Sequence, residues 1–223
     1  MKYALLIGIN YIGTPNELHG CHQDVDDVYA YLSTKGYKMT VLKDADHPTR
    51  ENIILNIKKI VSQCKPEDTL VFWYSGHGTY IKGNERDGRD ECLCATDGII
   101  TDNELRPLFR GCKIRAVFDA CHSGSILDLP LLYNKYIERE NNIPGTGNII
   151  SISGCRDNQT SADAVFVHPN GALTYHLLKA LKKGPYDWRD LMDKVRLNLK
   201  KDGFNQIPQL GMTNNYLYQL VDF

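Results

Sequence analysis

Apolar and polar positions along this chain follow two alternating periods. Short apolar runs rich in Val, Ile and aromatic residues, bounded by glycine or polar residues, are typical of buried strands. Such runs cover 3–9, 38–42, 69–74, 113–118 and 148–153, with two further candidates at 206–212 and 216–221. Apolar residues recur at helical spacing over 22–34, 48–61, 102–109, 172–182 and 188–199. This alternation predicts an α/β domain, with a parallel sheet covered by helices on both faces.

Two segments lack either period. The polar stretch 82–90 predicts an exposed loop between short strands. The stretch 128–147 is the longest irregular segment, and we expect a loop or a partly helical excursion there, inside one domain that spans 1–223.

Composition narrows the function classes. The chain has 223 residues, 42% of them hydrophobic and 24% charged, which suffices for one substantial core but is short for two domains. A formal net charge of -1 predicts no general attraction to nucleic acid or to membranes. No apolar run approaches the roughly 20 residues of a membrane span, and the first run lacks a signal-peptide cleavage site. We therefore expect a cytoplasmic protein.

The cysteines favour reduced thiols. There are seven, an odd number without regular spacing, which argues against a disulfide framework. The Cys92-Leu93-Cys94 segment has no matching second pair, and the neighbouring His19, Cys21 and His22 lack the spacing of a zinc finger. We therefore expect no zinc site.

Two short motifs directly follow predicted strands. Tyr-Ser-Gly-His-Gly occupies 74–78 and Asp-Ala-Cys-His-Ser-Gly occupies 119–124. In open α/β sheets, ligands bind beyond the carboxyl ends of the strands. The motifs therefore place His77 and Cys121 in one crevice, as expected for a thiol nucleophile with an imidazole base. The backbone N–H groups of Gly76 and Gly78 are candidate donors to an oxyanion.

Each of these residues also fits a purely structural role. Taken singly, Cys121 fits a buried thiol and His77 a polar loop residue, but both together at two strand ends favour catalysis. His122 is a second candidate base, although its adjacency to Cys121 directs its side chain away from the thiol. The other histidines have no comparable context, and we expect them at the surface or in caps: His19, His22, His47, His168 and His176.

These motifs belong to a series that resembles the metacaspases, a branch of the caspase-like cysteine peptidases. The other matching segments are 4–11, 18–25, 152–163 and 206–210, in the order found in that family. The resemblance implies a caspase-hemoglobinase fold with His77 and Cys121 as the catalytic dyad. It also implies a monomer, because metacaspases keep covered the sheet edge through which caspases dimerise.

The chain departs from larger metacaspases in two respects. No proline-rich or zinc-finger prodomain precedes the first strand, and the connection between the subunit-like regions is short. We expect a minimal single-domain form, with a large-subunit-like region over about 1–130 and a small-subunit-like region over about 146–223.

The resemblance also implies a pocket for the substrate residue that precedes the cleaved bond, the P1 residue. Its lining would be Asp24 and Asp119, with Cys21 and Ser75. Asp119 lies two residues before Cys121, hence on the same side of an extended strand end. A carboxylate pair suits the guanidinium of Arg or the ammonium of Lys. Asp24 could instead serve as a favourable charge at a helix amino terminus.

Calcium is the cofactor implied by the resemblance. The candidate ligands are Asp90, Asp102 and Asp128, because calcium prefers oxygen ligands. Asn103 stands where the family often has a second aspartate, which should weaken the site. The alternative is that these are solvated loop acids.

Self-cleavage, if it occurs, is expected within 128–147, where Lys135 and Arg139 are suitable P1 residues. Arg86 and Arg89 in the polar loop are competing sites.

The function expected from the sequence is therefore a cysteine endopeptidase that cleaves peptide bonds after Arg or Lys and is stimulated by calcium. One alternative is a catalytically silent caspase-like scaffold, which the intact His77 and Cys121 argue against. Another is a different thiol enzyme on the same scaffold, such as an acyltransferase, for which the two carboxylates have no evident use.

Overall fold

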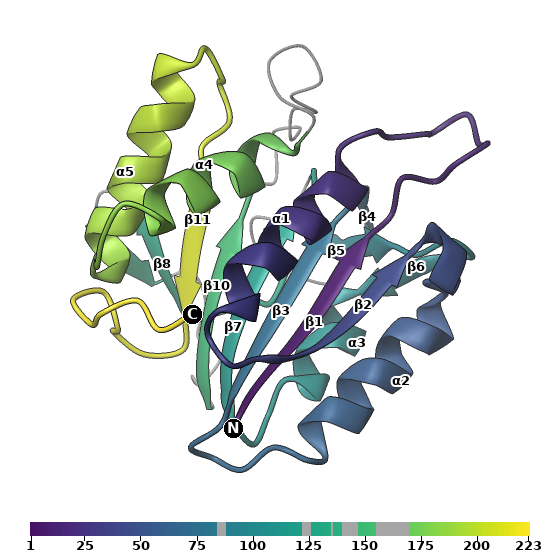
Figure 1. Cartoon of the computed structure of the whole chain (residues 1–223), viewed down its shortest axis with the longest axis horizontal. Coiled ribbons are helices and arrows are strands. Elements are labelled where there is room, and N and C mark those ends of the chain that lie inside the picture. Colours follow the sequence, from purple (N-terminus) through teal and green to yellow (C-terminus); the bar gives the residue numbers. More distant parts are fainter. Residues whose placement is uncertain (84–87, 122–125, 135, 140–146, 155–169) are drawn as a thin grey trace.

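The structure, a computed structural model, describes residues 1–83, 88–121, 126–134, 136–139, 147–154 and 170–223. It has three layers, with a central sheet between two layers of helices (Figure 1). The sheet has eight strands in the order β2-β1-β3-β7-β10-β11-β8-β9. Their bounds are β1 Lys2–Gly8, β2 Lys38–Lys43, β3 Thr69–Ser75, β7 Lys113–Asp119, β8 Leu131–Asn134, β9 Tyr136–Arg139, β10 Asn148–Ser153 and β11 Gln209–Met212.

The parallel part of the sheet follows the predicted pattern. β2, β1, β3, β7 and β10 pair in parallel, whereas β11, β8 and β9 continue the sheet with antiparallel pairing. The α/β class and the mostly parallel sheet are thus confirmed.

The expectation of an irregular segment over 128–147 is wrong in part, because β8 and β9 form a hairpin there. β8 pairs with β11, which lies more than 70 residues further along the chain. Strands of four residues, held by so distant a partner, carry too little local pattern to be recognised. Residues 135 and 140–146 of this segment lie outside the described part of the chain.

Helices pack on both faces of the sheet. α1 (Cys21–Ser33), α4 (Ala172–Leu181) and α5 (Trp188–Lys201) share one apolar core with side chains such as Leu6, Trp73 and Ile152. On the other face, α2 (Arg50–Val61) and α3 (Asp102–Leu105) pack on Leu5, Phe72 and Phe118. The alternation of faces along each strand follows from the two-residue period of a strand.

Three predicted elements differ from those observed. The helix expected over 102–109 is α3 followed by the 3-10 turn η2 (Arg106–Leu108), where Pro107 has no N–H to continue an α-helix. β11 begins only after Pro208, because proline has no N–H to donate to a neighbouring strand. A strand over 216–221 is wrong: this stretch contributes one isolated bridge, between Asp187 and Leu220, and Leu220 is 69% exposed.

A small antiparallel sheet begins directly after His77. It consists of β4 (Gly78–Lys82), β5 (Arg89–Cys94) and β6 (Ile99–Thr101). The predicted short strands on either side of the polar stretch are therefore present, while residues 84–87 between them are outside the described part. The remaining element is the 3-10 turn η1 (Asp44–Asp46) after β2.

Two expectations from composition can be compared with the structure. The six cysteines in the described ranges are thiols rather than disulfides, while Cys155 falls outside those ranges. Within the same ranges, no helix is both long and apolar enough to cross a bilayer.

Candidate active site

Three adjacent parallel strands, β1, β3 and β7, end at the same level of the sheet. Gly8 at the end of β1 pairs with Ser75 of β3, and Ser75 pairs with Asp119 of β7. His77 and Cys121 each follow two residues later. Parallel pairing therefore brings the two predicted catalytic residues to the same edge, although they are distant in sequence.

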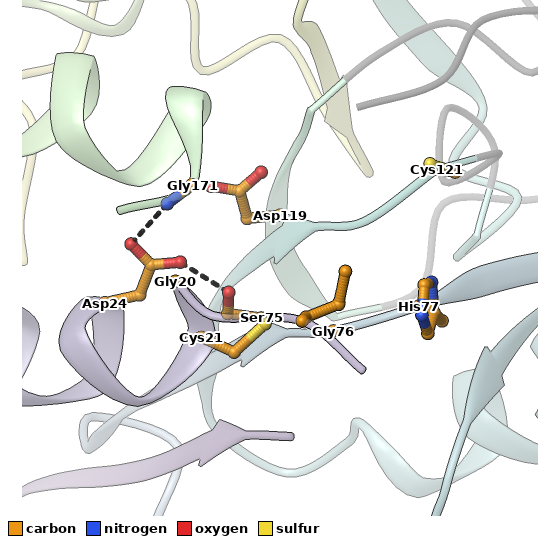
Figure 2. Close-up of a pocket in the computed structure, with 10 residues that line it drawn as sticks. Gly20, Cys21, Asp24, Ser75, Gly76, His77, Asp119, Cys121 and Gly171 are labelled. Carbon is orange, nitrogen blue, oxygen red and sulfur yellow. Dashed lines mark hydrogen bonds between the residues drawn. The ribbon is translucent and has the colours of Figure 1, made fainter. Parts of the chain in front are cut away.

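A pocket of about 100 Å³ opens at this edge. Figure 2 shows His77 and Cys121 at one end of it and Asp24 and Asp119 toward the other. The predicted site residues that line it are Cys21, Asp24, Ser75, His77, Asp119 and Cys121, and they are joined by Leu18, Gly20, Gly76 and Gly171.

Close packing of α1 on β1 brings Cys21 and Asp24 into the pocket. A Cβ at Gly8 would lie 2.4 Å from the Cys21 carbonyl oxygen and 2.8 Å from Val25 Cγ2. Only glycine leaves room for the amino terminus of α1 to approach the strand end this closely. The β1 glycine thus determines where Asp24 lies.

Neutral donors from two other elements hold the Asp24 carboxylate. Ser75 Oγ donates to its Oδ2 at 2.5 Å, and the Gly171 N–H donates to its Oδ1 at 2.9 Å. Asp119 Oδ2 accepts from the N–H of Thr174 in α4 at 2.8 Å. A Cβ at Gly171 would lie 2.3 Å from Asp119 Oδ2 and 2.8 Å from Asp24 Oδ2. Glycine therefore lets the start of α4 contact both carboxylates.

The Asp24 side chain lies in the first turn of α1 but bonds to other elements. Its carboxylate bonds to β3 and to the residue before α4 rather than to the free N–H groups of its own helix. Asp24 is completely buried, and burial raises its pKa well above the usual range. The nearby Asp119 charge raises it further, against the opposing effect of the hydrogen bonds from Ser75 and Gly171. An arriving cation would offset this repulsion.

A backbone carbonyl orients the His77 ring. His77 Nε2 lies 2.7 Å from the Asn16 carbonyl oxygen. A carbonyl oxygen can only accept, so Nε2 carries the proton and a neutral ring has its lone pair on Nδ1. The loop between β1 and α1 thereby fixes the tautomer of the imidazole.

The start of β4 packs against the backbone of Cys121. A Cβ at Gly78 would lie 2.0 Å from the Cys121 carbonyl oxygen, so this position requires glycine. Gly78 borders Cys121 without lining the pocket, and its role as an oxyanion donor remains a prediction. His122, the alternative base, lies outside the described residues.

Sequence reasoning missed three groups around His77. The Tyr11 hydroxyl accepts from the His77 N–H at 2.9 Å, and the Tyr74 hydroxyl donates to the His77 carbonyl at 2.8 Å. Both tyrosines stand in the motifs already singled out, but spacing along the chain does not show that they meet. Asn16 acts through its backbone, so its residue type carries no signal.

The predicted calcium ligands gather near the small sheet. Asp102 is fully buried and accepts from the Glu91 N–H at 2.9 Å and the Asn103 N–H at 2.5 Å. Burial, with smaller contributions from the Asp128 and Asp90 charges, raises its pKa to about 6 against these N–H donors. Asp90 Oδ1 is buried without a hydrogen-bond partner in the described structure.

The donor set of this acidic cluster, Asp90, Asp102 and Asp128, fits a hard cation in chemistry, since all its ligands are oxygens that repel one another. It does not fit in geometry. Among the residues that the structure describes, no three His, Cys, Asp or Glu side chains converge as metal ligands.

The remaining histidines agree with expectation except for one. His19 and His47 are exposed, and the half-buried His22, in the first turn of α1, bonds to Asp44 Oδ2 at 2.6 Å. His176 in contrast is 1% exposed, with its Nε2 3.6 Å from Asp202 Oδ2, so the surface expectation for it is wrong. The reason is that Asp202 and Phe204, which follow α5, pack against its ring. His168 lies outside the described ranges.

Comparison with known proteins identifies the family. Residues 1–216 match the family described as the caspase domain. A metacaspase-1 of Meyerozyma guilliermondii is 35% identical over 286 aligned positions, covering 96% of this chain and 70% of the relative. A metacaspase-2 of Trypanosoma brucei brucei is 36% identical, covering 93% of this chain and 72% of the relative.

A solved structure shares the fold. The crystal structure of a protein from Geobacter sulfurreducens superimposes with a TM-score of 0.75 at 26% identity, covering 98% of this chain and 97% of that one. Both metacaspase alignments run longer than the 223 residues of this chain, so these relatives carry insertions that it lacks. The pocket geometry and the match over nearly the whole sequence lead to one assignment: the chain belongs to the caspase-domain family, as a caspase-like cysteine peptidase of the metacaspase type.

Proposed function

We propose that this protein is a cysteine endopeptidase that cleaves after Arg or Lys, with Cys121 as nucleophile and His77 as base. One observation carries the proposal. A single pocket joins a thiol and an oriented imidazole at one end to two buried carboxylates at the other. The first pair can break an amide bond, and the second can select a cationic side chain.

Acylation would follow from the His77 tautomer. Nδ1 takes the proton from Cys121 Sγ, and the thiolate attacks the carbonyl carbon of the scissile bond. The carbonyl π electrons move to oxygen, and a backbone N–H donor, proposed to be that of Gly78, stabilises the resulting oxyanion. The protonated imidazole then gives its proton to the leaving amine as the C–N bond breaks, which leaves an acyl thioester on Cys121.

Hydrolysis completes the cycle. Nδ1 of His77 removes a proton from water, and the resulting hydroxide adds to the thioester carbonyl. When the C–S bond breaks, Cys121 leaves as a thiolate and recovers its proton from the imidazolium. The Asn16 carbonyl supports both steps, because it accepts from Nε2 more strongly when the ring is charged.

The carboxylate pair supports the choice of a basic P1 residue. The Asp24 carboxylate accepts from uncharged donors, Ser75 Oγ and the Gly171 N–H, and Asp119 accepts from the Thr174 N–H. These donors satisfy some lone pairs without neutralising the charge. A guanidinium or an ammonium would supply both the charge and the remaining hydrogen bonds.

Calcium is proposed as the activating cofactor, held by Asp90, Asp102 and Asp128. The mutual repulsion of these acids and the unpartnered Asp90 Oδ1 favour a cation there. Since the three side chains do not converge in the described structure, binding would have to rearrange the loops that carry them.

Self-cleavage within 128–147 and a monomeric, cytoplasmic enzyme complete the proposal. Arg139 lies in β9, which among the described strands pairs with β8 alone, and Arg89 begins β5. Both would have to leave a strand pair before cleavage. Lys135 and Arg86 are outside the described residues. Mass analysis of calcium-treated enzyme, with Cys121→Ala as control, would locate any cut, and light scattering would test the monomer.

The decisive experiment is hydrolysis of a peptide library by the wild type and by Cys121→Ala and His77→Ala. We expect cleavage after Arg and Lys, with each variant reduced by orders of magnitude because it lacks the nucleophile or the base. If either variant keeps more than about a tenth of the activity, the assignment of the dyad is wrong. A wild-type protein without peptidase activity would instead favour the silent scaffold.

A further inference from the structure

Tyr11, on the loop after β1, adopts a backbone conformation that is unusual for its residue type. Its φ is +53°, in the left-handed region that disfavours residues other than glycine. The Asp44 carboxylate clamps the chain on both sides of it. Oδ2 accepts from the Asn10 N–H at 2.8 Å, and Oδ1 accepts from the Ile12 N–H at 3.1 Å. Such a conformation persists only where the surroundings hold it, and it is often associated with function.

The clamped conformation directs the Tyr11 side chain to His77. Its hydroxyl lies 2.9 Å from the His77 backbone nitrogen and 2.7 Å from the Cys94 carbonyl oxygen. Its ring also packs on the imidazole, with ring centroids 4.7 Å apart and planes inclined by 37°. One residue therefore contacts both the backbone and the ring face of His77.

The Tyr11 hydroxyl can donate one hydrogen bond and accept another. Burial raises the pKa of Tyr11, so the phenol keeps its proton and donates it to the Cys94 carbonyl. Its oxygen is then the acceptor for the His77 N–H. Without the hydroxyl, this N–H would lose its partner in a partly buried site.

A second phenol completes the support. The Tyr74 hydroxyl lies 3.0 Å from that of Tyr11, and it can donate to the carbonyls of His77 and Cys94, both at 2.8 Å. A Cβ at Gly76 would lie 2.7 Å from the Tyr74 hydroxyl and 2.9 Å from that of Tyr11. The first glycine of the Ser-Gly-His-Gly motif is thus the residue that leaves space for both hydroxyls.

We propose that Tyr11 is a positioning residue for the reaction, which holds the imidazole of His77 in register with Cys121. The inference rests on the proposed role of His77 as the base. Three contacts fix the histidine: the Asn16 carbonyl at Nε2, the Tyr11 ring against its face and the Tyr11 hydroxyl at its backbone N–H. Tyr11 itself touches neither the thiol nor the reacting carbonyl in this role.

The test is Tyr11→Phe, which keeps the ring and removes only the hydroxyl. Loss of a partner for a buried donor predicts a fall in kcat of roughly tenfold, with KM for an Arg-P1 peptide nearly unchanged. The rate of Cys121 alkylation by iodoacetamide should also reach its half-maximum at higher pH, since a misaligned imidazole stabilises the thiolate less. A residue that serves the fold alone would not move this pH profile.

The matched control is Tyr37→Phe. The Tyr37 hydroxyl is buried without a hydrogen-bond partner in the described structure, just before β2 and away from the pocket. This variant should keep both the wild-type kcat and the wild-type alkylation profile.

A second variant covers the case in which Tyr11→Phe does not fold. Asp44→Asn places an amide N–H against one of the two backbone donors, so it loosens the clamp on Tyr11 and should lower kcat in the same direction. Wild-type kcat and an unshifted alkylation profile in either folded variant would overturn the proposal.

Failure of the proposed function would look different. In that case wild-type enzyme would not cleave the Arg-P1 peptide, or Cys121→Ala would still cleave it. The alkylation profile, which needs no substrate, would then still report whether Tyr11 acts on the imidazole.

Discussion

The molecule gathers aspartates in two places, and only one of them is organised around an open space. In the pocket, Asp24 and Asp119 accept from donors on β3, on the residue before α4 and on α4 itself, so two elements of the central fold hold the pair. In the acidic cluster, Asp102 accepts from the backbone N–H groups of its neighbours Glu91 and Asn103 instead. The first arrangement leaves a formed cavity between the acids and the thiol.

The difference follows from what each set of acids is attached to. Asp119 stands at the end of β7, in a register that places Ser75 directly beside it, and Asp24 lies in the first turn of α1, which packs closely on β1. Asp90 and Asp102 belong to the small sheet and to a helix of four residues, and Asp128 lies in a loop at φ +44°. Under the proposed function, the pocket could accept an organic cation in its present form, whereas the cluster would have to rearrange to take up a metal ion.

The largest effect expected from this comparison is that of Asp24→Asn on cleavage after Arg. A charge-assisted hydrogen bond contributes about 1.5–3 kcal/mol, so kcat/KM should fall by at least roughly tenfold. Added calcium should not restore it, because none of the proposed calcium ligands lines the pocket and calcium cannot replace the lost carboxylate. Kinetics with an Arg-P1 peptide across a calcium titration would measure this.

The control for this variant is Asp26→Asn, on the same helix, whose carboxylate is exposed and pairs with Lys43. It should leave kcat/KM unchanged. Efficient cleavage after Asp, with none after Arg, would contradict the proposed role of the pocket.

An intermediate effect is expected for Asp102→Asn. Removing one carboxylate ligand should raise the calcium concentration for half-maximal activity by roughly tenfold, since affinity follows the ligand charge. Thermal shift on adding calcium gives a second readout that does not need catalysis. Glu104→Gln is the control, because Glu104 pairs with Arg50 rather than with the cluster. Full activity in chelator, unchanged by calcium, would show that the cluster has no such role.

The smallest effect concerns stability and pH. The pKa of Asp24 is raised in the folded state. Protonation of this carboxyl therefore contributes to the stability of the fold. The contribution is fully present below the unfolded-state pKa of about 3.9 and is lost as the pH rises through the folded-state pKa. The amide of Asp24→Asn does not titrate, so the stability of this variant should not fall with pH for this reason. At pH 8 we therefore expect the variant to melt higher than wild type, by about 2–4 °C for each 1 kcal/mol gained.

Calorimetric scans from pH 4 to pH 8 would follow the gap between the two melting temperatures. The gap should widen with pH while the activity of the variant stays low. A variant that melts lower than wild type at every pH would mean that the carboxylate stabilises the pocket rather than straining it.

The sequence alone determined the parallel half of the fold and the residues that meet at its edge. β10 was predicted with its observed bounds, Asn148–Ser153, and β3 to within one residue. Buried parallel strands are apolar on both faces, so each can be recognised from its own continuous apolar run. The motifs containing His77 and Cys121 follow two such strands directly, and parallel pairing then brings them together.

Only the tertiary structure decided the rest, because it depends on partners remote in sequence or on groups that all residues share. β8 is a strand through its pairing with β11, and His176 is buried through the packing of α5 over α4. The tautomer of His77 depends on the carbonyl of Asn16, a backbone atom that any residue would supply. Tyr11 reaches His77 because Asp44 accepts from the N–H groups of Asn10 and Ile12, which are 34 and 32 positions away, and no local pattern encodes these contacts.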